Sequence, residues 1–116
     1  MRVSEAFVDH VARSGRKLIV SLTSGMGSLA DNTSGGSIAY RSSKTAVNMV
    51  MRSLAIDLAP RGITCVVVNP GWVQTDMGGA HATLTPVESV GRAAMTNNRV
   101  RGILPSFALH LGQHPL

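Results

Sequence analysis

The sequence predicts an α/β domain built on a parallel β-sheet, and three features lead to this fold class. Residues 17–22 (KLIVSL) and 63–71 (ITCVVVNPG) each hold a short continuous apolar run, which is typical of strands buried on both faces of a parallel sheet. Residues 42–59 lie between these runs and carry an apolar stripe with helical periodicity. Strand, helix and strand in this order form a βαβ unit with a right-handed crossover.

Local signals mark where these and other elements end. Residues 3–13 carry apolar side chains at three- and four-residue spacings, which predicts a helix that Gly15 stops. Pro60 ends the long helix, because the residue before a proline disfavours the α conformation. Residues 85–88 (TPVE) form a capping box with proline at the first helical position, so another helix should start there. Beyond residue 95 the pattern fades, and the apolar run at 102–111 (GILPSFALHL) is broken by a proline and receives no predicted element.

The length and composition of the chain indicate its domain size and its cellular compartment. The chain has 116 residues, of which 44% are hydrophobic and 15% charged, so we expect one small folded domain. No apolar stretch approaches the roughly 18 residues of a membrane span, and residues 1–16 do not resemble a signal peptide. The single cysteine, Cys65, excludes an internal disulfide and should be a small core residue. We therefore expect a cytoplasmic protein that does not bind a membrane.

The charge pattern and the histidines argue against two further classes of partner. The formal net charge is +5, but the basic residues are dispersed and only 3% of the residues are aromatic, so we expect no nucleic-acid binding. The histidines show no metal-ligand spacing beyond the pair His110 and His114 near the C-terminus. A chance pair explains that spacing better than a zinc site, and we expect no metal centre.

Residues 25–30 (GMGSLA) fit the glycine pattern of a dinucleotide-phosphate loop. Such a loop opens a helix at its last glycines, so that the helix N–H groups meet the pyrophosphate. Here the chain continues with residues 31–36 (DNTSGG), a turn-forming cluster. An acidic residue about 20 positions further on, for the ribose hydroxyl, is also missing, because residues 43–50 read SKTAVNMV. We predict that this glycine pattern does not bind phosphate.

A second candidate site combines Tyr40 and Lys44 with polar residues at the strand ends. At spacing i and i+4 the two side chains share one face of a helix start. A tyrosine hydroxyl has a reference pKa of about 10, and a neighbouring ammonium stabilises the phenolate and makes the group a usable general acid–base. Ser24 follows the first strand and residues 69–71 (NPG) end the second, so both should lie at the carboxyl edge of the sheet, where α/β proteins bind ligands. The Tyr–Lys spacing alone would more often be an ordinary amphipathic helix start.

Three motifs in this order resemble the catalytic half of the short-chain dehydrogenase/reductase family. They are TSGMG at 23–27, YRSSK at 40–44 and NPGWVQTDM at 69–77. The longer stretch from residue 24 to residue 63 resembles the C-factor-like branch of that family. The resemblance covers residues 17–91 and leaves 92–116 as a divergent tail. It implies a partial Rossmann-like, doubly wound parallel sheet, with residues 1–116 forming a single truncated domain of that type.

The resemblance also implies an activity, hydride transfer between NAD or NADP and a carbonyl or alcohol substrate. Tyr40 would be the general acid–base. Lys44 would support Tyr40 and hydrogen-bond the nicotinamide ribose, and Ser24 would hold the substrate oxygen against the phenol. The implied cofactor contacts are Tyr40, Lys44, Pro70, Gly71, Val73 and Thr75.

The sequence departs from this family in ways that bear on activity. It contains no glycine-rich phosphate loop after a first strand, and residues 1–16 hold no counterpart of the family's catalytic asparagine. We therefore expect the 116-residue chain alone to bind NAD(P)H weakly or not at all and to have little dehydrogenase activity. Met49 and Ile56 lie off the main apolar stripe of the 42–59 helix and should face a partner. The resemblance implies that this helix lies at a subunit interface, so we expect a homo-oligomer contact; the alternative is a contact with a missing half. The alternatives are a non-catalytic interaction or signalling fragment, or a truncated product with no independent role.

Overall fold

A computed structural model of the chain describes residues 1–100 and 108–110, with side chains described for residues 1–93. In chain order the elements are α1 (Arg2–Arg13), β1 (Leu18–Leu22), the 3₁₀ turn η1 (Gly25–Gly27), α2 (Ile38–Leu58), the 3₁₀ turn η2 (Ala59–Arg61), β2 (Thr64–Val68), α3 (Pro86–Val100) and β3 (Ala108–His110). No helix within these described residues is both long and apolar enough to cross a membrane.

The strands form one parallel sheet in the order β1-β2-β3. The register of β1 on β2 runs from Leu18 opposite Thr64 to Leu22 opposite Val68, and α2 forms the crossover between these two strands. The predicted α/β class and the βαβ unit are therefore confirmed. The second strand is shorter than predicted, because Asn69 and the two residues after it leave the ladder.

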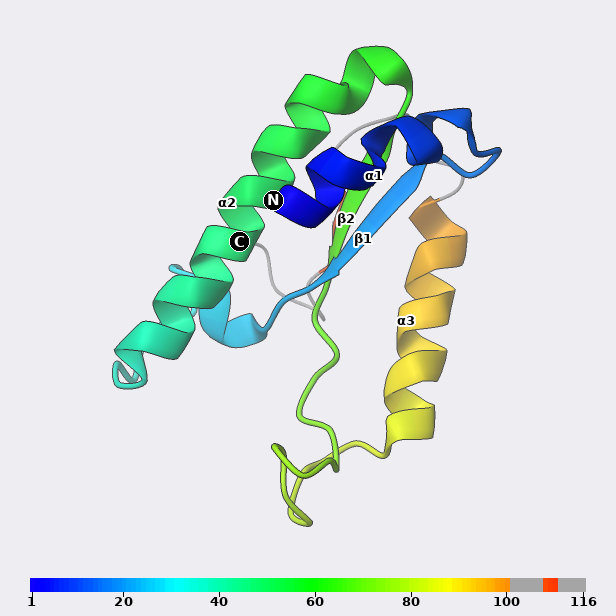
Figure 1. Ribbon diagram of the computed structural model, residues 1–116. Coiled ribbons are helices and arrows are strands. Elements are labelled where there is room, and N and C mark those ends of the chain that lie inside the picture. The colour runs from blue at the N-terminus through cyan, green and yellow to red at the C-terminus, as the bar shows by residue number, and fades with distance from the viewer. Residues whose placement is uncertain (101–107, 111–116) are drawn as a thin grey trace.

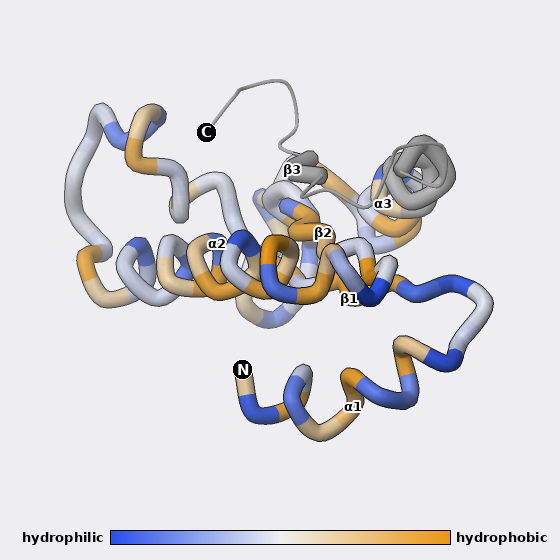
Figure 2. Tube along the Cα trace, turned by 90° about the horizontal axis from the view of Figure 1, so that it is seen from above, coloured by the Kyte–Doolittle hydropathy of each residue, from blue (hydrophilic) through white to orange (hydrophobic). Residues whose placement is uncertain are grey.

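Helices cover both faces of the sheet, with α2 and α3 on opposite sides and α1 beside β1 (Figure 1). The larger core cluster joins α2 to one face of β2, and residues of α1 pack against it. Its buried members are Met51, Leu54, Ala55, Ile63, Cys65 and Val67. On the other face Val66 and Val68 pack against Ala93 of α3. Seen from above, apolar residues gather where α2 meets β2 (Figure 2). Burial raises the pKa of the Cys65 thiol, which fits a protonated core residue.

The long helix begins at Ile38, four residues before the predicted start at Ser42. Ser37 precedes it in a left-handed conformation, with φ of 46°, and makes no side-chain cap hydrogen bond within the described chain. The turn is held instead by Arg41, whose Nε donates to the carbonyl oxygens of Gly35 and Gly36 at 3.2 Å each. Because the Arg41 side chain reaches back over the turn in place of a capping side chain at Ser37, no capping residue in the sequence marked the start of α2. Tyr40 consequently lies inside the first turn of α2.

The C-terminal region also differs from the sequence-based expectation. The helix that starts at the capping box runs to Val100, beyond the point where the periodic pattern faded. Ala108–His110 form a third parallel strand, within the apolar run to which no element was assigned. Three residues are too few to show a periodicity. His114 lies outside the described residues, and the described part of the chain holds no group of three or more metal-binding side chains.

The first strand is less buried than its sequence predicted. Val20 and Leu22 are 50% and 62% exposed, whereas β2 is buried along four of its five residues. Among the described strands β1 pairs only with β2, so its other edge is open. An apolar groove of about 380 Å³ runs between α1 and β1 and is lined by Phe7, Val11 and Leu18 among others. The apolar run of β1 is typical of a strand with neighbours on both sides, and the described chain supplies a strand on one side only, so part of β1 is exposed.

A matched pair of substitutions tests the position of the core. Ile63 is 1% exposed and Ile56 is 60% exposed. We expect Ile63→Val to lower the free energy of unfolding by about 1 kcal/mol, since it removes one methylene from a packed site. The same change at Ile56 should alter it by less than about 0.5 kcal/mol. Urea unfolding of the two variants measures the difference, and equal losses would contradict this core.

The capping box of α3 predicts a pH dependence of stability. Thr85 N donates to Glu88 Oε2 at 2.8 Å, and Glu88 N donates to Thr85 Oγ1 at 3.3 Å. The backbone and hydroxyl hydrogen bonds from Thr85 hold the pKa of Glu88 below its ordinary value of 4.5. The stabilisation is therefore complete above that value and is lost as the pH falls through the lower folded-state pKa. Urea midpoints should fall more steeply below about pH 4.5 in the wild type than in Glu88→Gln, with Glu5→Gln as the control. Identical pH profiles for wild type and Glu88→Gln would exclude this contribution.

Candidate functional site

The carboxyl ends of β1 and β2 bring two polar segments together. Thr23 N donates to Val68 O at 2.9 Å, which extends the ladder one residue beyond β1. A Cβ placed on Gly25 would lie 3.2 Å from Asn69 Nδ2, so the turn after β1 lies directly beside the residue that follows β2. Ser24 stands at this junction and is half-buried.

Residues 25–27 form only the single 3₁₀ turn η1. Ser24 Oγ accepts a hydrogen bond from Met26 N at 3.2 Å, so the hydroxyl proton remains free to be donated elsewhere. The chain then runs through a loop to Ser37, and the next α-helix begins at Ile38. The segment therefore lacks the α-helix that a dinucleotide-phosphate loop opens. Its second glycine serves close packing instead, because a Cβ on Gly27 would lie 2.9 Å from the backbone and Cβ of Lys44.

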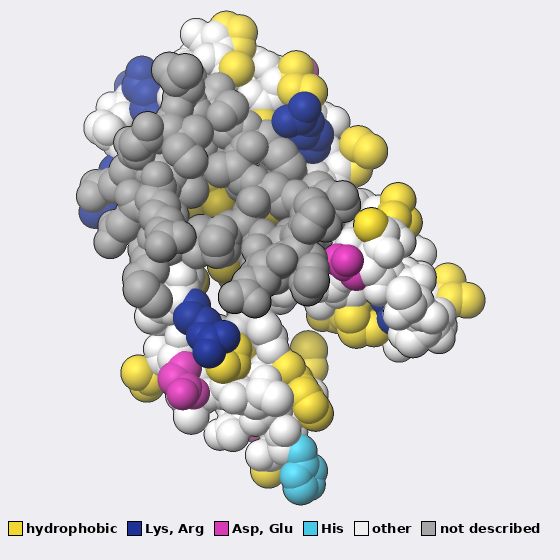
Figure 3. All heavy atoms as spheres, turned by 180° about the vertical axis from the view of Figure 1, so that it is seen from behind, with side chains coloured by type: hydrophobic (Ala, Val, Ile, Leu, Met, Phe, Trp, Pro, Cys, Tyr) yellow, Lys and Arg dark blue, Asp and Glu magenta, His cyan; other side chains and the backbone are white. Residues whose placement is uncertain are grey.

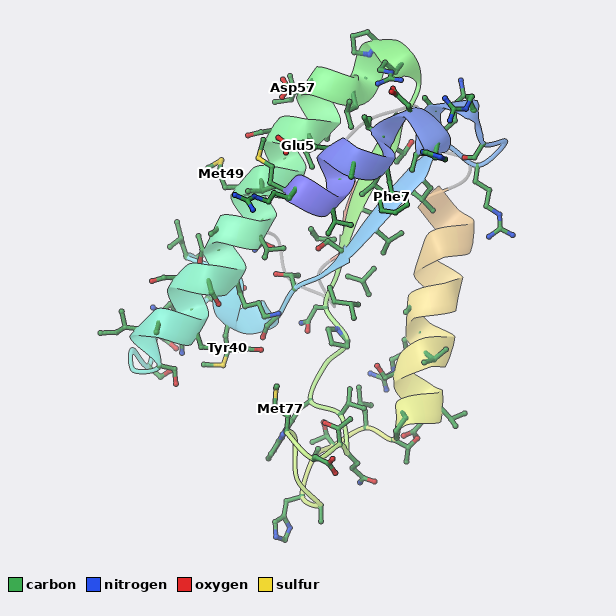
Figure 4. The ribbon with its side chains drawn as sticks, viewed as in Figure 1. Glu5, Phe7, Tyr40, Met49, Asp57 and Met77 are labelled. Atoms are coloured by element: carbon green, nitrogen blue, oxygen red, sulfur yellow. The ribbon has the colours of Figure 1, made fainter. Side chains whose placement is uncertain are left out.

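Tyr40 and Lys44 lie side by side on one face of α2. Lys44 Nζ is 5.7 Å from the centre of the Tyr40 ring, within the range of a cation–π contact. Tyr40 is 40% exposed and Lys44 is half-buried, so both side chains are accessible to a ligand. Figure 4 shows Tyr40 on the side of α2 that faces the loop carrying Met77. The arrangement offers a proton donor with a cation next to it at the carboxyl edge.

The loop after β2 is closed by its own hydrogen bonds. Leu84 N donates to Trp72 O at 3.0 Å and Gln74 N donates to Leu84 O at 2.8 Å, around an isolated bridge between Val73 and Leu84. Ser89 Oγ donates to Pro70 O at 2.8 Å and ties the loop to α3. In the space-filling view from behind, a notch separates this loop from the start of α2 (Figure 3). The two segments thus border an open space above the strand ends.

The predicted cofactor contacts of this loop lie along its first half. Pro70 and Val73 are half-buried, and Gly71 and Thr75 are exposed. Gly71 has a φ of +78°, a left-handed conformation that favours glycine, and a Cβ there would lie 2.6 Å from a methyl carbon of Leu84. Thr75 Oγ1 accepts a hydrogen bond from Gly78 N at 3.1 Å. Their roles toward a cofactor, like those of Ser24, Tyr40 and Lys44 toward a substrate, stay predictions.

Sequence reasoning missed two buried polar residues behind the site. Thr23 and Asn48 are 3% and 7% exposed. The available signal was the presence of an asparagine four residues after Lys44, within a helix whose buried stripe is otherwise apolar.

Comparison with known proteins identifies the family. The short chain dehydrogenase profile matches residues 1–83. The C-signal protein of Myxococcus xanthus is 49% identical over 90 residues, which are 78% of this chain and 54% of that protein. The chain therefore belongs to the short-chain dehydrogenase family, and it spans about half the length of the Myxococcus xanthus relative.

Solved structures agree with this assignment. A short-chain dehydrogenase/reductase of Burkholderia multivorans with bound NADP is 38% identical with a TM-score of 0.81, and the match covers 94% of this chain and 46% of that one. The NADPH-bound carbonyl reductase from chicken fatty liver is 30% identical with a TM-score of 0.79, over 92% of this chain and 48% of that one. The fold is thus a partial Rossmann-type parallel sheet, as the sequence motifs implied.

Proposed function

We propose that this chain carries the catalytic half of an NAD(P)-dependent oxidoreductase that interconverts a carbonyl and an alcohol. The observation that carries the proposal is the Lys44 ammonium 5.7 Å from the Tyr40 ring, at the sheet edge where Ser24 also lies. Relatives with bound NADP and NADPH support the class of cofactor. The cytoplasm, where free thiols such as Cys65 stay reduced, is the proposed location.

The residues of the site divide the proton chemistry among them. A bound nicotinamide cofactor would supply hydride to the carbonyl carbon. Tyr40 would donate its proton to the carbonyl oxygen, and the Lys44 ammonium would stabilise the phenolate that remains. The free proton of Ser24 would hold the same oxygen in place. The exposed Tyr40 and the half-buried Lys44 are accessible to a ligand. In the proposed complex Lys44 would donate to the ribose hydroxyls of the nicotinamide riboside, and residues 70–75 would border its ring.

A fusion tests the role of Tyr40. The chain would replace the matching half of the chicken carbonyl reductase, and NADPH-dependent carbonyl reduction would be measured. We expect activity in the fusion and a fall in kcat of about 10²-fold or more for Tyr40→Phe, because the general acid is lost. Met49→Leu, a volume-conserving change at an exposed site of the same helix, should leave kcat unchanged. An active fusion that is indifferent to Tyr40→Phe would refute the mechanism.

The 116-residue chain alone should bind the cofactor poorly. We propose that the adenosine and pyrophosphate contacts are made by a part of the fold that would pack beyond the open edge of β1. We therefore expect a fluorescence titration of the purified chain with NADPH to give little or no saturation, and the fusion to bind more tightly. Saturation of the chain itself at low micromolar NADPH would overturn this expectation.

A second candidate function is that of a non-catalytic interaction or signalling fragment. The open edge of β1 and the apolar groove between α1 and β1 favour it, since such surfaces pair readily with another chain. Met49 and Ile56, both exposed on α2, offer a separate surface for a homo-oligomer (Figure 4). The name of the Myxococcus xanthus relative, C-signal, agrees with a signalling role. A discrete oligomer that binds no NADPH, seen by light scattering, would favour this candidate over the first.

A further inference from the structure

A buried hydrogen bond joins the end of β1 to the middle of α2. Thr23 Oγ1 donates to Asn48 Oδ1 at 2.6 Å, and the two residues are 25 positions apart in the chain. Thr23 is also fixed on its other side, because its N–H continues the ladder with Val68. Asn48 follows Lys44 by four residues as Lys44 follows Tyr40, so all three side chains share one face of α2.

The other end of the serine turn is attached to the same helix. The carbonyl oxygen of Gly27 accepts from Thr45 Oγ1 at 2.9 Å and from Asn48 Nδ2 at 3.4 Å. Gly27 also packs against Lys44 so closely that a Cβ would meet the Lys44 backbone at 2.9 Å. Residues 24–26 are therefore anchored to α2 on both sides, by Thr23 before them and by Gly27 after them. Ser24 lies between these two anchors.

From these contacts we infer that Thr23 and Asn48 are positioning residues, which hold the Ser24 hydroxyl at a fixed place against the helix that carries Tyr40 and Lys44. The inference rests on the proposed function, since Ser24 and Tyr40 must act on one oxygen for their alignment to matter. It adds two residues that touch neither substrate nor cofactor and act only through Ser24.

A double substitution can distinguish this positioning role from a contribution to fold stability alone. Replacing both partners of a buried hydrogen bond by apolar groups of similar shape can be nearly neutral for stability. Thr23→Val together with Asn48→Leu should therefore leave the chain folded. The double change nevertheless removes the Thr23–Asn48 bond before Ser24 and the Asn48–Gly27 bond after it, which a packed apolar pair does not replace. The bond from Thr45 Oγ1 to Gly27 O remains. If Thr23 and Asn48 only stabilise the fold, the double variant should keep Ser24 aligned with Tyr40. If they position Ser24, the double variant should lose that alignment.

The chain contains a single tyrosine, so its phenol can be observed without ambiguity. The probe is the 116-residue chain labelled with ¹³C at the hydroxyl-bearing ring carbon of tyrosine, whose NMR signal responds to hydrogen bonding at that oxygen. We expect Ser24→Ala to displace this signal in the wild-type background. In the Thr23→Val/Asn48→Leu background the same substitution should displace it at least about twofold less, because coupled sites are non-additive. In a Thr23→Ser background, which keeps the hydroxyl donor to Asn48, Ser24→Ala should displace the signal as fully as in the wild type.

The controls and the possible outcomes distinguish a failure of this inference from a failure of the proposed function. Ile63→Val lowers stability without touching these contacts and should leave the Ser24→Ala displacement intact. Should the double variant fail to fold, Thr23→Val alone against Thr23→Ser gives the same comparison. If Ser24→Ala displaces the signal equally in all backgrounds, the inference is wrong and the proposed function stands. If Ser24→Ala never displaces it, Ser24 and Tyr40 do not form one site, and both the proposed function and the inference fall.

Discussion

The parallel pairing of β1 with β2 is the constraint on which the site depends. Parallel register puts the carboxyl ends of both strands at one edge, where Thr23 N meets Val68 O. The connecting helix must run back across the sheet, so α2 begins at that same edge. The turn after β1, the first turns of α2 and the loop after β2 therefore start at the same edge, and the turn after β1 contacts both Asn69 and Lys44. One register in the sheet thus assembles three segments.

Local signals predicted those elements whose boundaries depend on neighbouring residues. The Thr85–Glu88 capping box marked the start of α3, and the Val-rich run marked β2, because both act within a few residues. The start of α2 was misplaced because Arg41 holds the preceding turn through its long side chain in place of a cap at Ser37. β3 escaped notice because its three residues are defined only by pairing with β2.

The same distinction holds for the site. Tyr40 and Lys44 are one helical turn apart, so their spacing alone predicts that they lie together, as their 5.7 Å contact bears out. The contact of Thr23 with Asn48 spans 25 residues and depends on how α2 crosses the sheet, which no local pattern encodes. The glycines at 25 and 27 illustrate the ambiguity of short motifs. Their spacing fits a phosphate loop, while their use here is the close approach of a turn to Asn69 and Lys44.

The described chain is asymmetric about β1. On one side, β1, η1 and α2 form a unit in which every described buried polar side-chain atom has a hydrogen-bond partner. On the other side, the outer edge of β1 is open and Val20 and Leu22 are half or more exposed. Parallel sheets are otherwise found with both faces covered, since their strands are apolar on both sides. The described contacts of Lys44 with Tyr40 and Gly27 thus lie within the β1–α2 unit, whereas β1 itself is only partly covered. A strand or chain that covered this edge would bury Val20 and Leu22, so apolar burial favours association at this edge.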